Sequence, residues 1–364
     1  MLNQEIPFGY LFIASSVFFH GKDLRDSLDK EALWIFLFSF IYTAFNALGK
    51  NSGVQYLIIQ IVFPVIFYTT GKFAMKNISS NAGRINFLIL LGSAYAFTPL
   101  ISILQALASE GFVASQREVK SIWTGAFMKS TGTAAKLIYV LTIPGILIAA
   151  KKVLKPRMTL LWLGLFAVTL VASFRTGSRT CLAIAGISLA IGIALYLISQ
   201  NLIGKIRTII VIGLSLFVIT KSGIIDLESD IFSVLGARLL EENTSSVSTA
   251  GNRTQLWSHA IEELVENPLG WTSAEYAHNT WLDIAHVGGV LSLVLFVIIN
   301  IFCFRSLYRL SNFDDNNLAM TLLGWLFIVS SFMIFFGEPI VLGNFFAITI
   351  YLFFQGSFKE ISMK

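Results

Sequence analysis

Long apolar runs, separated by short polar segments, make up most of this chain of 364 residues. A helix needs about 20 mostly apolar residues to cross the roughly 30 Å of hydrocarbon in a bilayer. The pattern predicts about eleven such spans, at 6–20, 32–49, 54–75, 86–108, 134–150, 158–174, 180–200, 207–220, 282–304, 318–336 and 344–356. We therefore expect an all-α integral membrane protein that crosses the bilayer many times.

The composition excludes most other classes of protein. Hydrophobic residues make up 55% of the chain and charged residues only 13%, against about 25% charged in an ordinary soluble domain. These values exclude a disordered chain, a coiled coil, a disulfide scaffold and a water-soluble enzyme. Cys181 and Cys303 lie inside apolar runs, so we expect neither a zinc site nor a disulfide. The net charge of +5 does not indicate nucleic acid, because the basic residues are not pooled in one patch.

The basic residues predict how the spans are oriented, since Lys and Arg concentrate in cytoplasmic loops. Four basic clusters fall on the same side of the predicted membrane: Lys151, Lys152, Lys155 and Arg157; Lys205 and Arg207; Arg305 and Arg309; Lys359 and Lys364. We assign that side to the cytoplasm, which with eleven spans leaves the N-terminus outside. The first run has no basic region before it and no cleavage site after it, so we expect no cleavable signal peptide.

Three segments then face the opposite side: residues 109–133, the turn 175–179 and the long loop 221–281. Residues 221–280 carry nine acidic and three basic side chains, a net charge of −6 that fits an extracytoplasmic loop. We predict one polytopic membrane domain over 1–364 whose extracytoplasmic loop is partly helical.

Two amphipathic helices are predicted inside this loop. From Arg253 onward, apolar residues recur at helical spacing, with Asn252 as the N-cap and residues 266–270 as the stop. A second amphipathic stretch covers 227–239. We expect both helices to lie along the membrane surface with the apolar face down.

Three arginines on the outer side are candidates for binding an anion. Arg175 and Arg179 bracket a five-residue outer turn, where positive charge is disfavoured, and the planar guanidinium suits phosphate. They therefore suggest a pyrophosphate clamp, or else two side chains that reach lipid headgroups. Arg253 begins a helix, where a cation opposes the helix dipole. A bound anion would explain it, as would a surface position at a frayed helix end.

His278 lies where the long loop meets the ninth span. An imidazole at such an interface can accept a proton from a hydroxyl group near neutral pH. The alternative is a histidine that only bonds to the backbone at the entrance of the span. Asn279 beside it is an auxiliary candidate. Asp283 and His286 lie three residues apart on one helical face, and we expect them to pair inside the bundle.

The sequence contains no histidine pair with the spacing of a metal site. Asp226, Glu228 and Asp230 alternate at the start of the long loop, where they would hold a divalent metal or form a solvated acidic face. We expect no metal and no cofactor. Arg117, an auxiliary candidate, and Lys120 lie in the other outer segment and would add positive charge to an anionic site.

The motifs of this chain, and their order along it, resemble those of the bacterial O-antigen polymerase and O-antigen ligase superfamily. Three pieces carry the resemblance: Arg175-Thr176-Gly177-Ser178-Arg179-Thr180; Gly251-Asn252-Arg253-Thr254-Gln255-Leu256-Trp257 with Asn267-Pro268-Leu269-Gly270; and His278-Asn279-Thr280-Trp281-Leu282 with Gly288-Gly289. The likeness covers about residues 84–305 and is firmest over 170–295.

The resemblance implies a GT-C-like fold and an inverting, metal-independent membrane glycosyltransferase in the bacterial inner (cytoplasmic) membrane, with its active site facing the periplasm. Its donor would be a glycan on undecaprenyl pyrophosphate, its acceptor a glycolipid, and a chain-length regulator protein a candidate partner. By position, Arg179 and Arg253 would bind the pyrophosphate, with Arg175 assisting. His278 would activate the acceptor hydroxyl.

Three functions stay open at this point. A polymerase joins lipid-linked repeat units for surface polysaccharide, and the short chain with Trp281-Leu282-Asp283 favours it slightly. An O-antigen ligase, which moves the finished glycan to the lipopolysaccharide core, shares the same motifs. A transporter or flippase for a lipid-linked solute would usually show internal repeats and mid-membrane charges. This chain shows no repeat, and its unusual charges gather at one membrane face.

Overall fold

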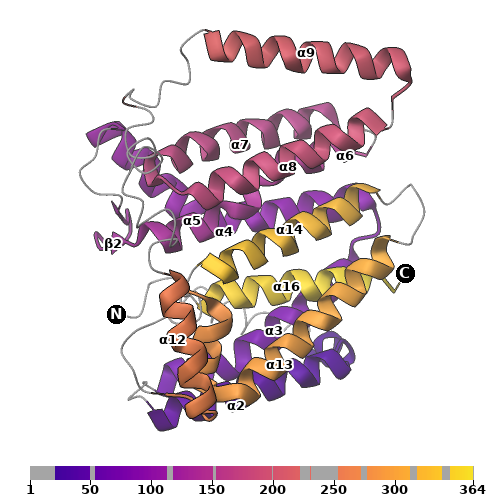
Figure 1. Ribbon diagram of the computed structural model, residues 1–364. Coiled ribbons are helices and arrows are strands. Elements are labelled where there is room, and N and C mark those ends of the chain that lie inside the picture. Colours follow the sequence, from indigo (N-terminus) through magenta and orange to yellow (C-terminus); the bar gives the residue numbers. More distant parts are fainter. Residues whose placement is uncertain are drawn as a thin grey trace. The chain divides into compact units, whose positions relative to one another are not determined.

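A computed structural model describes residues 21–49, 54–112, 118–150, 153–198, 200–221, 230, 253–271, 277–311, 318–337 and 345–363. Helices dominate this part of the chain (Figure 1). Eight stretches in it are long and apolar enough to cross a membrane. They comprise α2 (Lys30–Gly49), α3 (Val54–Asn77), α4 (Asn81–Glu110), α5 (Ser130–Leu141) together with α6 (Ile143–Ala149), α7 (Pro156–Thr176), α8 (Arg179–Ile198), α13 (Thr280–Ser311) and α14 (Leu318–Gly337).

The protein is therefore a multi-pass, all-α membrane protein, and these eight stretches coincide with eight of the predicted spans. Two further helices, α9 (Leu202–Lys221) and α16 (Phe345–Ile361), cover the predicted spans near 207–220 and 344–356. The predicted span at 6–20 and the amphipathic stretch at 227–239 lie outside the described ranges, apart from residue 230. The count of eleven spans stays a prediction.

The fifth predicted span is divided into α5 and α6 at Thr142. Pro144 stands in the first turn of α6 and has no backbone N–H to bond to the preceding turn. The Thr142 hydroxyl donates to the Tyr139 carbonyl oxygen at 2.7 Å, which caps the end of α5. A proline in the first turn of a helix is favourable, so the sequence begins a new helix here without leaving the span.

The segment between α4 and α5 contains a small hairpin that the sequence did not predict. Strands β1 (Val119–Lys120) and β2 (Phe127–Met128) pair antiparallel, with Val119 opposite Met128. Strands of two residues are too short to show an alternating pattern, so periodicity could not reveal them.

The chain forms two compact units, each assembled from segments that are distant in sequence. The first unit comprises Met1–Arg84, Asn243–Asn317 and Phe327–Lys364, and includes α2, α3, α12 (Arg253–Glu266), α13 and α16. The second unit comprises Ile85–Glu242 and Leu318–Leu326, and includes α5 to α9 and the hairpin. Arg253 and His278 therefore belong to the first unit, and Arg175 and Arg179 to the second.

Helices α3 and α16 form the closest helix contact in the first unit (Figure 1). A Cβ added to Gly71 of α3 would overlap the Phe353 carbonyl oxygen, and one added to Gly356 of α16 would overlap the Tyr68 carbonyl oxygen. The two glycines thus let the backbones meet, as small residues do between membrane helices. Helix α13 packs against both α2 and α16 and completes this bundle.

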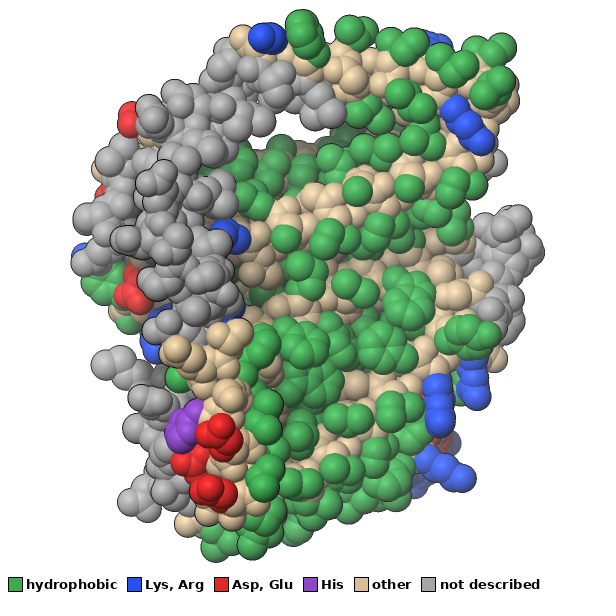
Figure 2. Space-filling model, in the orientation of Figure 1, with side chains coloured by type: hydrophobic (Ala, Val, Ile, Leu, Met, Phe, Trp, Pro, Cys, Tyr) green, Lys and Arg blue, Asp and Glu red, His purple; other side chains and the backbone are tan. Residues whose placement is uncertain are grey.

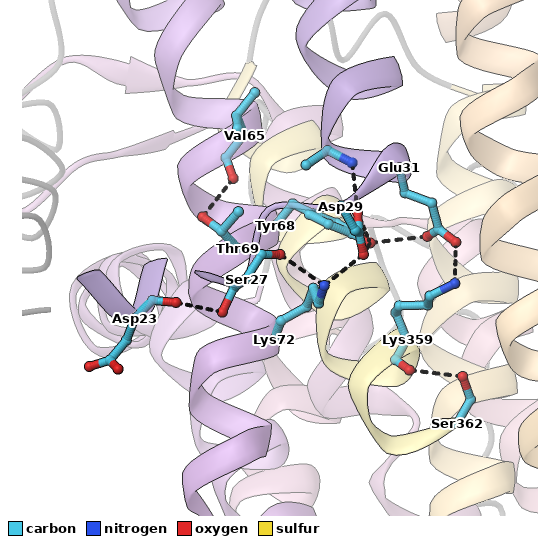
Figure 3. A network of polar contacts seen from close by, with 11 residues as sticks. Asp23, Ser27, Asp29, Glu31, Val65, Tyr68, Thr69, Lys72, Lys359 and Ser362 are labelled. Atoms are coloured by element: carbon cyan, nitrogen blue, oxygen red, sulfur yellow. Dashed lines mark hydrogen bonds and ion pairs between the residues drawn. The ribbon is translucent and has the colours of Figure 1, made fainter. Parts of the chain in front are cut away.

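A partly buried network of charges joins α2, α3 and α16 near the C-terminal ends of α3 and α16 (Figure 3). The Lys72 ammonium lies 2.6 Å from an Asp29 oxygen, and the Lys359 ammonium bonds to Glu31. Tyr68 donates its hydroxyl proton to Glu31 at 3.0 Å. Two ammonium groups thus face two carboxylates, so no net charge is buried.

Removal of one carboxylate should destabilise the protein, because it leaves an ammonium group without its ion-pair partner. Glu31→Ala should lower the free energy of unfolding by about 3–5 kcal/mol, because it leaves the Lys359 ammonium without its carboxylate. The double variant Glu31→Leu with Lys359→Met should regain most of that loss. Thermal unfolding of the detergent-solubilised protein measures both. Asp26→Ala, at a side chain 49% exposed, is the control, and an equal loss in it would contradict the prediction.

Candidate functional site

Helix α13 begins at Thr280, two residues after the predicted catalytic histidine, and Asn279 between them is its N-cap. The Asn279 side-chain oxygen accepts hydrogen bonds from the backbone N–H groups of Trp281 at 3.0 Å and Leu282 at 3.5 Å. Asparagine is among the best N-cap residues for this reason. Asn279 is buried, so the contacts described for it are those of a helix cap.

The backbone around His278 is held by buried side chains. The carboxylate of Asp283, fully buried, accepts from the N–H of Ala277 at 3.0 Å and from the N–H of Asn279 at 3.2 Å. The Trp257 indole of α12 donates to the Ala277 carbonyl oxygen at 2.9 Å. His278 itself is exposed and has a φ of +50°, the one positive φ outside glycine among the described residues.

The contacts described for Asp283 and His286 are with other residues and not with each other. Both carboxylate oxygens of Asp283 bond to the backbone N–H groups that flank His278. The His286 ring, one turn further along α13, is buried and stacks on Trp271, with centroids 4.8 Å apart and planes 10° from parallel.

Helix α13 is kinked at Gly289, three residues after His286, and the turn that follows α12 packs against the kink. Gly289 has a φ of +65° and a ψ of −173°, which breaks the helical bonding. The Val290 N–H then donates to the Pro268 carbonyl oxygen at 2.9 Å, and the Trp271 N–H donates to the His286 carbonyl oxygen at 3.1 Å. The backbone groups released by the kink are thus paired again.

Only glycine fits at the two closest points of this junction. A Cβ on Gly289 would lie 2.5 Å from the Pro268 oxygen, and a Cβ on Gly270 would lie 2.8 Å from the His286 oxygen. Both glycines also have a positive φ. The Asn267-Pro268-Leu269-Gly270 and Gly288-Gly289 motifs are therefore two halves of one structural joint.

Trp281 fastens the first turn of α13 to the end of α14. Its ring packs within 4.9–6.4 Å, between centroids, of four phenylalanine rings, at Phe296, Phe332, Phe335 and Phe336. Arg253 reaches the same end of α14, because a Cβ added to Gly337 would lie 3.5 Å from the Arg253 Nη1 atom. Arg253 is partly exposed.

Helix α12 confirms the predicted amphipathic helix, with its start at Arg253 and its end at Glu266. Part of the predicted apolar face is covered by the protein, and part of it is exposed. Ala260 is buried, whereas Ile261 is 53% and Val265 77% exposed. At roughly 100° per residue the apolar positions cover about half the helix circumference, and α13 covers only part of that arc. The position of α12 along the membrane surface stays a prediction.

In the second unit, the turn 175–179 joins α7 to α8 through a glycine and a serine cap. Gly177 ends α7 in the left-handed conformation, with a φ of 58° and a ψ of 32°. The Ser178 hydroxyl accepts from the Cys181 N–H at 3.3 Å and caps the start of α8.

The two arginines of this turn have different surroundings. Arg175 is 1% exposed, and its Nη2 atom lies 3.2 Å from an oxygen of Glu110 at the end of α4. Arg179 is exposed at the first position of α8. Arg179 is thus the arginine of the turn that an anion in solution can reach, while Arg175 ties the turn to α4.

The remaining candidates are less informative. Arg117, Asp226 and Glu228 lie outside the described residues. Lys120 is exposed, with its ammonium 5.3 Å above the centroid of the Phe127 ring. Among the residues that the structure describes, no three His, Cys, Asp or Glu side chains are grouped to hold a metal ion.

No protein-family model matches this chain, and no curated protein matches it. The class of protein that the fold defines is therefore the multi-pass, all-α membrane protein. Its activity has to be argued from the motifs and from the geometry that they adopt.

Proposed function

We propose that this protein is a membrane glycosyltransferase, a polymerase of surface polysaccharide of the O-antigen type. It transfers a glycan from an undecaprenyl-pyrophosphate carrier to a hydroxyl group of an acceptor glycan, at the outer face of the bacterial inner membrane. The observation that carries the proposal is the exposed His278, fixed at the start of α13 by buried contacts and assembled with Arg253 in one unit.

The proposed reaction is an in-line displacement at the anomeric carbon of the donor. His278 accepts the proton of the acceptor hydroxyl, whose oxygen forms the new bond to that carbon. The bond to the pyrophosphate oxygen breaks, and undecaprenyl pyrophosphate leaves with the negative charge. Arg179 and Arg253 stabilise this charge, which is the part a metal ion plays in other transferases. The displacement inverts the anomeric configuration.

The ends of the helices support an outer location for these groups. Helix α7 has Arg157 in its first turn and Arg175 in its last, and α13 follows His278 and has Arg309 in its last turn. In the first unit, basic side chains gather near the C-terminus, and acidic and histidine side chains lie over the lower end of α12 (Figure 2). If Arg157 and Arg309 face the cytoplasm, His278 and the turn 175–179 face outward.

Arg179→Ala should lower kcat/KM for the lipid-linked donor by about 10²–10³-fold, the usual effect of removing one donor to a developing negative charge. Arg179→Lys should recover part of this loss, because the ammonium retains the charge but not the planar fork. The transfer rate of the purified protein measures both. Arg157→Ala, at the other end of α7, is the matched control and should retain normal transfer.

A polysaccharide gel of a deletion strain tests the function in cells. Loss of the polymerase should leave the core with one repeat unit, whereas bare core would identify a ligase. An unchanged ladder of chain lengths would contradict both. Proteoliposomes distinguish the enzyme from a transporter. Movement of the lipid-linked glycan across the bilayer without a new glycosidic bond would contradict our proposal and identify a transporter.

A further inference from the structure

His278 adopts a backbone conformation that L-residues rarely take. Its φ of +50° lies in the left-handed region, where Cβ comes too close to the following carbonyl oxygen. Such a residue persists only where its surroundings hold it, and strained residues of this kind cluster at functional sites. Glycine would adopt this conformation without strain. The presence of histidine in its place therefore indicates that the imidazole side chain is needed at this position.

Asp283 supplies the contacts that hold this conformation. Its two oxygens accept from the N–H groups of Ala277 and Asn279, at 3.0 and 3.2 Å, and these peptide groups stand on either side of His278. Because one side chain bonds to both of these peptide groups, the bridge constrains the backbone between them. The carboxylate is fully buried, a position that is costly unless its oxygens are bonded.

A plain helix start does not require this arrangement. The Asn279 side chain already caps α13 through the N–H groups of Trp281 and Leu282. One Asp283 oxygen accepts from the N–H of the cap residue Asn279, as a capping box does, but the other reaches Ala277, two residues before the cap. Trp257 of α12 holds the carbonyl oxygen of the same Ala277. The loop that presents His278 is therefore fixed from two helices at once.

From this geometry we infer that Asp283 is a positioning residue, which holds His278 in the left-handed conformation so that its imidazole is presented for proton transfer. The catalytic purpose of this positioning rests on the proposed function, whereas the role of Asp283 in holding the backbone conformation does not. An asparagine at 283 would fit the same space and accept through only one oxygen. Its amide would turn donors toward one of the two backbone N–H groups.

A double-mutant cycle on stability tests the conformation without any activity. His278→Gly should raise the melting temperature of the otherwise wild-type protein by roughly 2–4 °C, because it relieves the strain. In the Asp283→Asn background the same substitution should give no increase, because the loop has already relaxed. Equal shifts in both backgrounds would overturn the inference.

The transfer reaction tests the role. Asp283→Asn should lower kcat by about 10²-fold, as expected for a misplaced catalytic group, while KM for donor and acceptor stays unchanged. Trp257→Phe, which removes the bond to Ala277 but keeps a ring in place, should lower kcat in the same direction. Glu262→Gln, at an exposed carboxylate of α12, is the control and should be neutral.

These two tests fail in different ways. A normal kcat in Asp283→Asn, or a loss that appears only in KM, would overturn the positioning role. Absence of transfer by the wild-type protein would instead refute the proposed function, and the melting-temperature cycle would still decide whether Asp283 holds the strained loop.

Discussion

His278→Ala should reduce glycan transfer by about 10²–10⁴-fold, the range that a well-placed general base contributes, while the protein still accumulates in the membrane. The protein should still fold because the His278 side chain is exposed and lies outside the core. The hydrogen bonds that hold the loop are made by the backbone of Ala277 and Asn279. The ladder of polysaccharide lengths on a gel shows the loss in cells, and the initial rate of transfer by purified protein gives its size.

His259→Ala is the matched control, because His259 belongs to the same unit and lies on α12 with its side chain 53% exposed. It lies 3.6 Å from Glu263 one turn away, a surface pair that contributes little. A normal ladder from the His278 variant, or an equal loss in the His259 variant, would remove His278 from the catalytic role.

Gly71→Val and Gly356→Val should each destabilise the first unit by at least the roughly 1–3 kcal/mol typical of an overpacked core. The new Cβ would meet backbone oxygen atoms of the opposite helix, at Phe353 and Tyr68 respectively. Backbone cannot move aside as a flexible side chain can, so α3 and α16 would have to separate. Thermal unfolding and the monodispersity of the solubilised protein measure the effect.

Gly164→Val is the control for this pair, since a Cβ at Gly164 in α7 would meet nothing within 4 Å. Valine there should unfold at about the wild-type temperature, because it loses no contact and replaces a poor helix former. If the variants at Gly71 and Gly356 unfolded at the same temperature as this control, the close contact of α3 with α16 would be wrong.

Much of the fold could be predicted because membrane helices are encoded locally. Each needs only enough apolar residues to cross the bilayer, so eight described stretches coincide with the predicted runs. The kink in α13 could not be predicted in this way. It depends on the turn 267–271, which supplies the bonds that Gly289 leaves open. That dependence is tertiary, and an apolar run does not reveal it.

The candidate site divides along the same line. The start of α12 at Arg253 and the position of His278 at the entrance of α13 follow from local patterns. The partner of Arg175 does not, because Glu110 lies 65 residues earlier in the chain. The bond of Asp283 to the N–H of Asn279 resembles a capping box, but Asp283 stands one position beyond the N3 residue that the usual pattern employs. The spacing of three residues on one helical face instead predicts a pair with His286.

Our central proposal is that Arg253 and His278 of the first unit and Arg179 of the second unit are each required to transfer a glycan from a lipid pyrophosphate. The most direct measurement uses the purified protein in proteoliposomes with undecaprenyl-pyrophosphate-linked glycan and an acceptor glycan. We expect the wild-type protein to form one new glycosidic bond for each undecaprenyl pyrophosphate released, and alanine variants at the three positions to form almost none. Equal product from wild type and all three variants, or no new glycosidic bond from the wild type, would contradict the account.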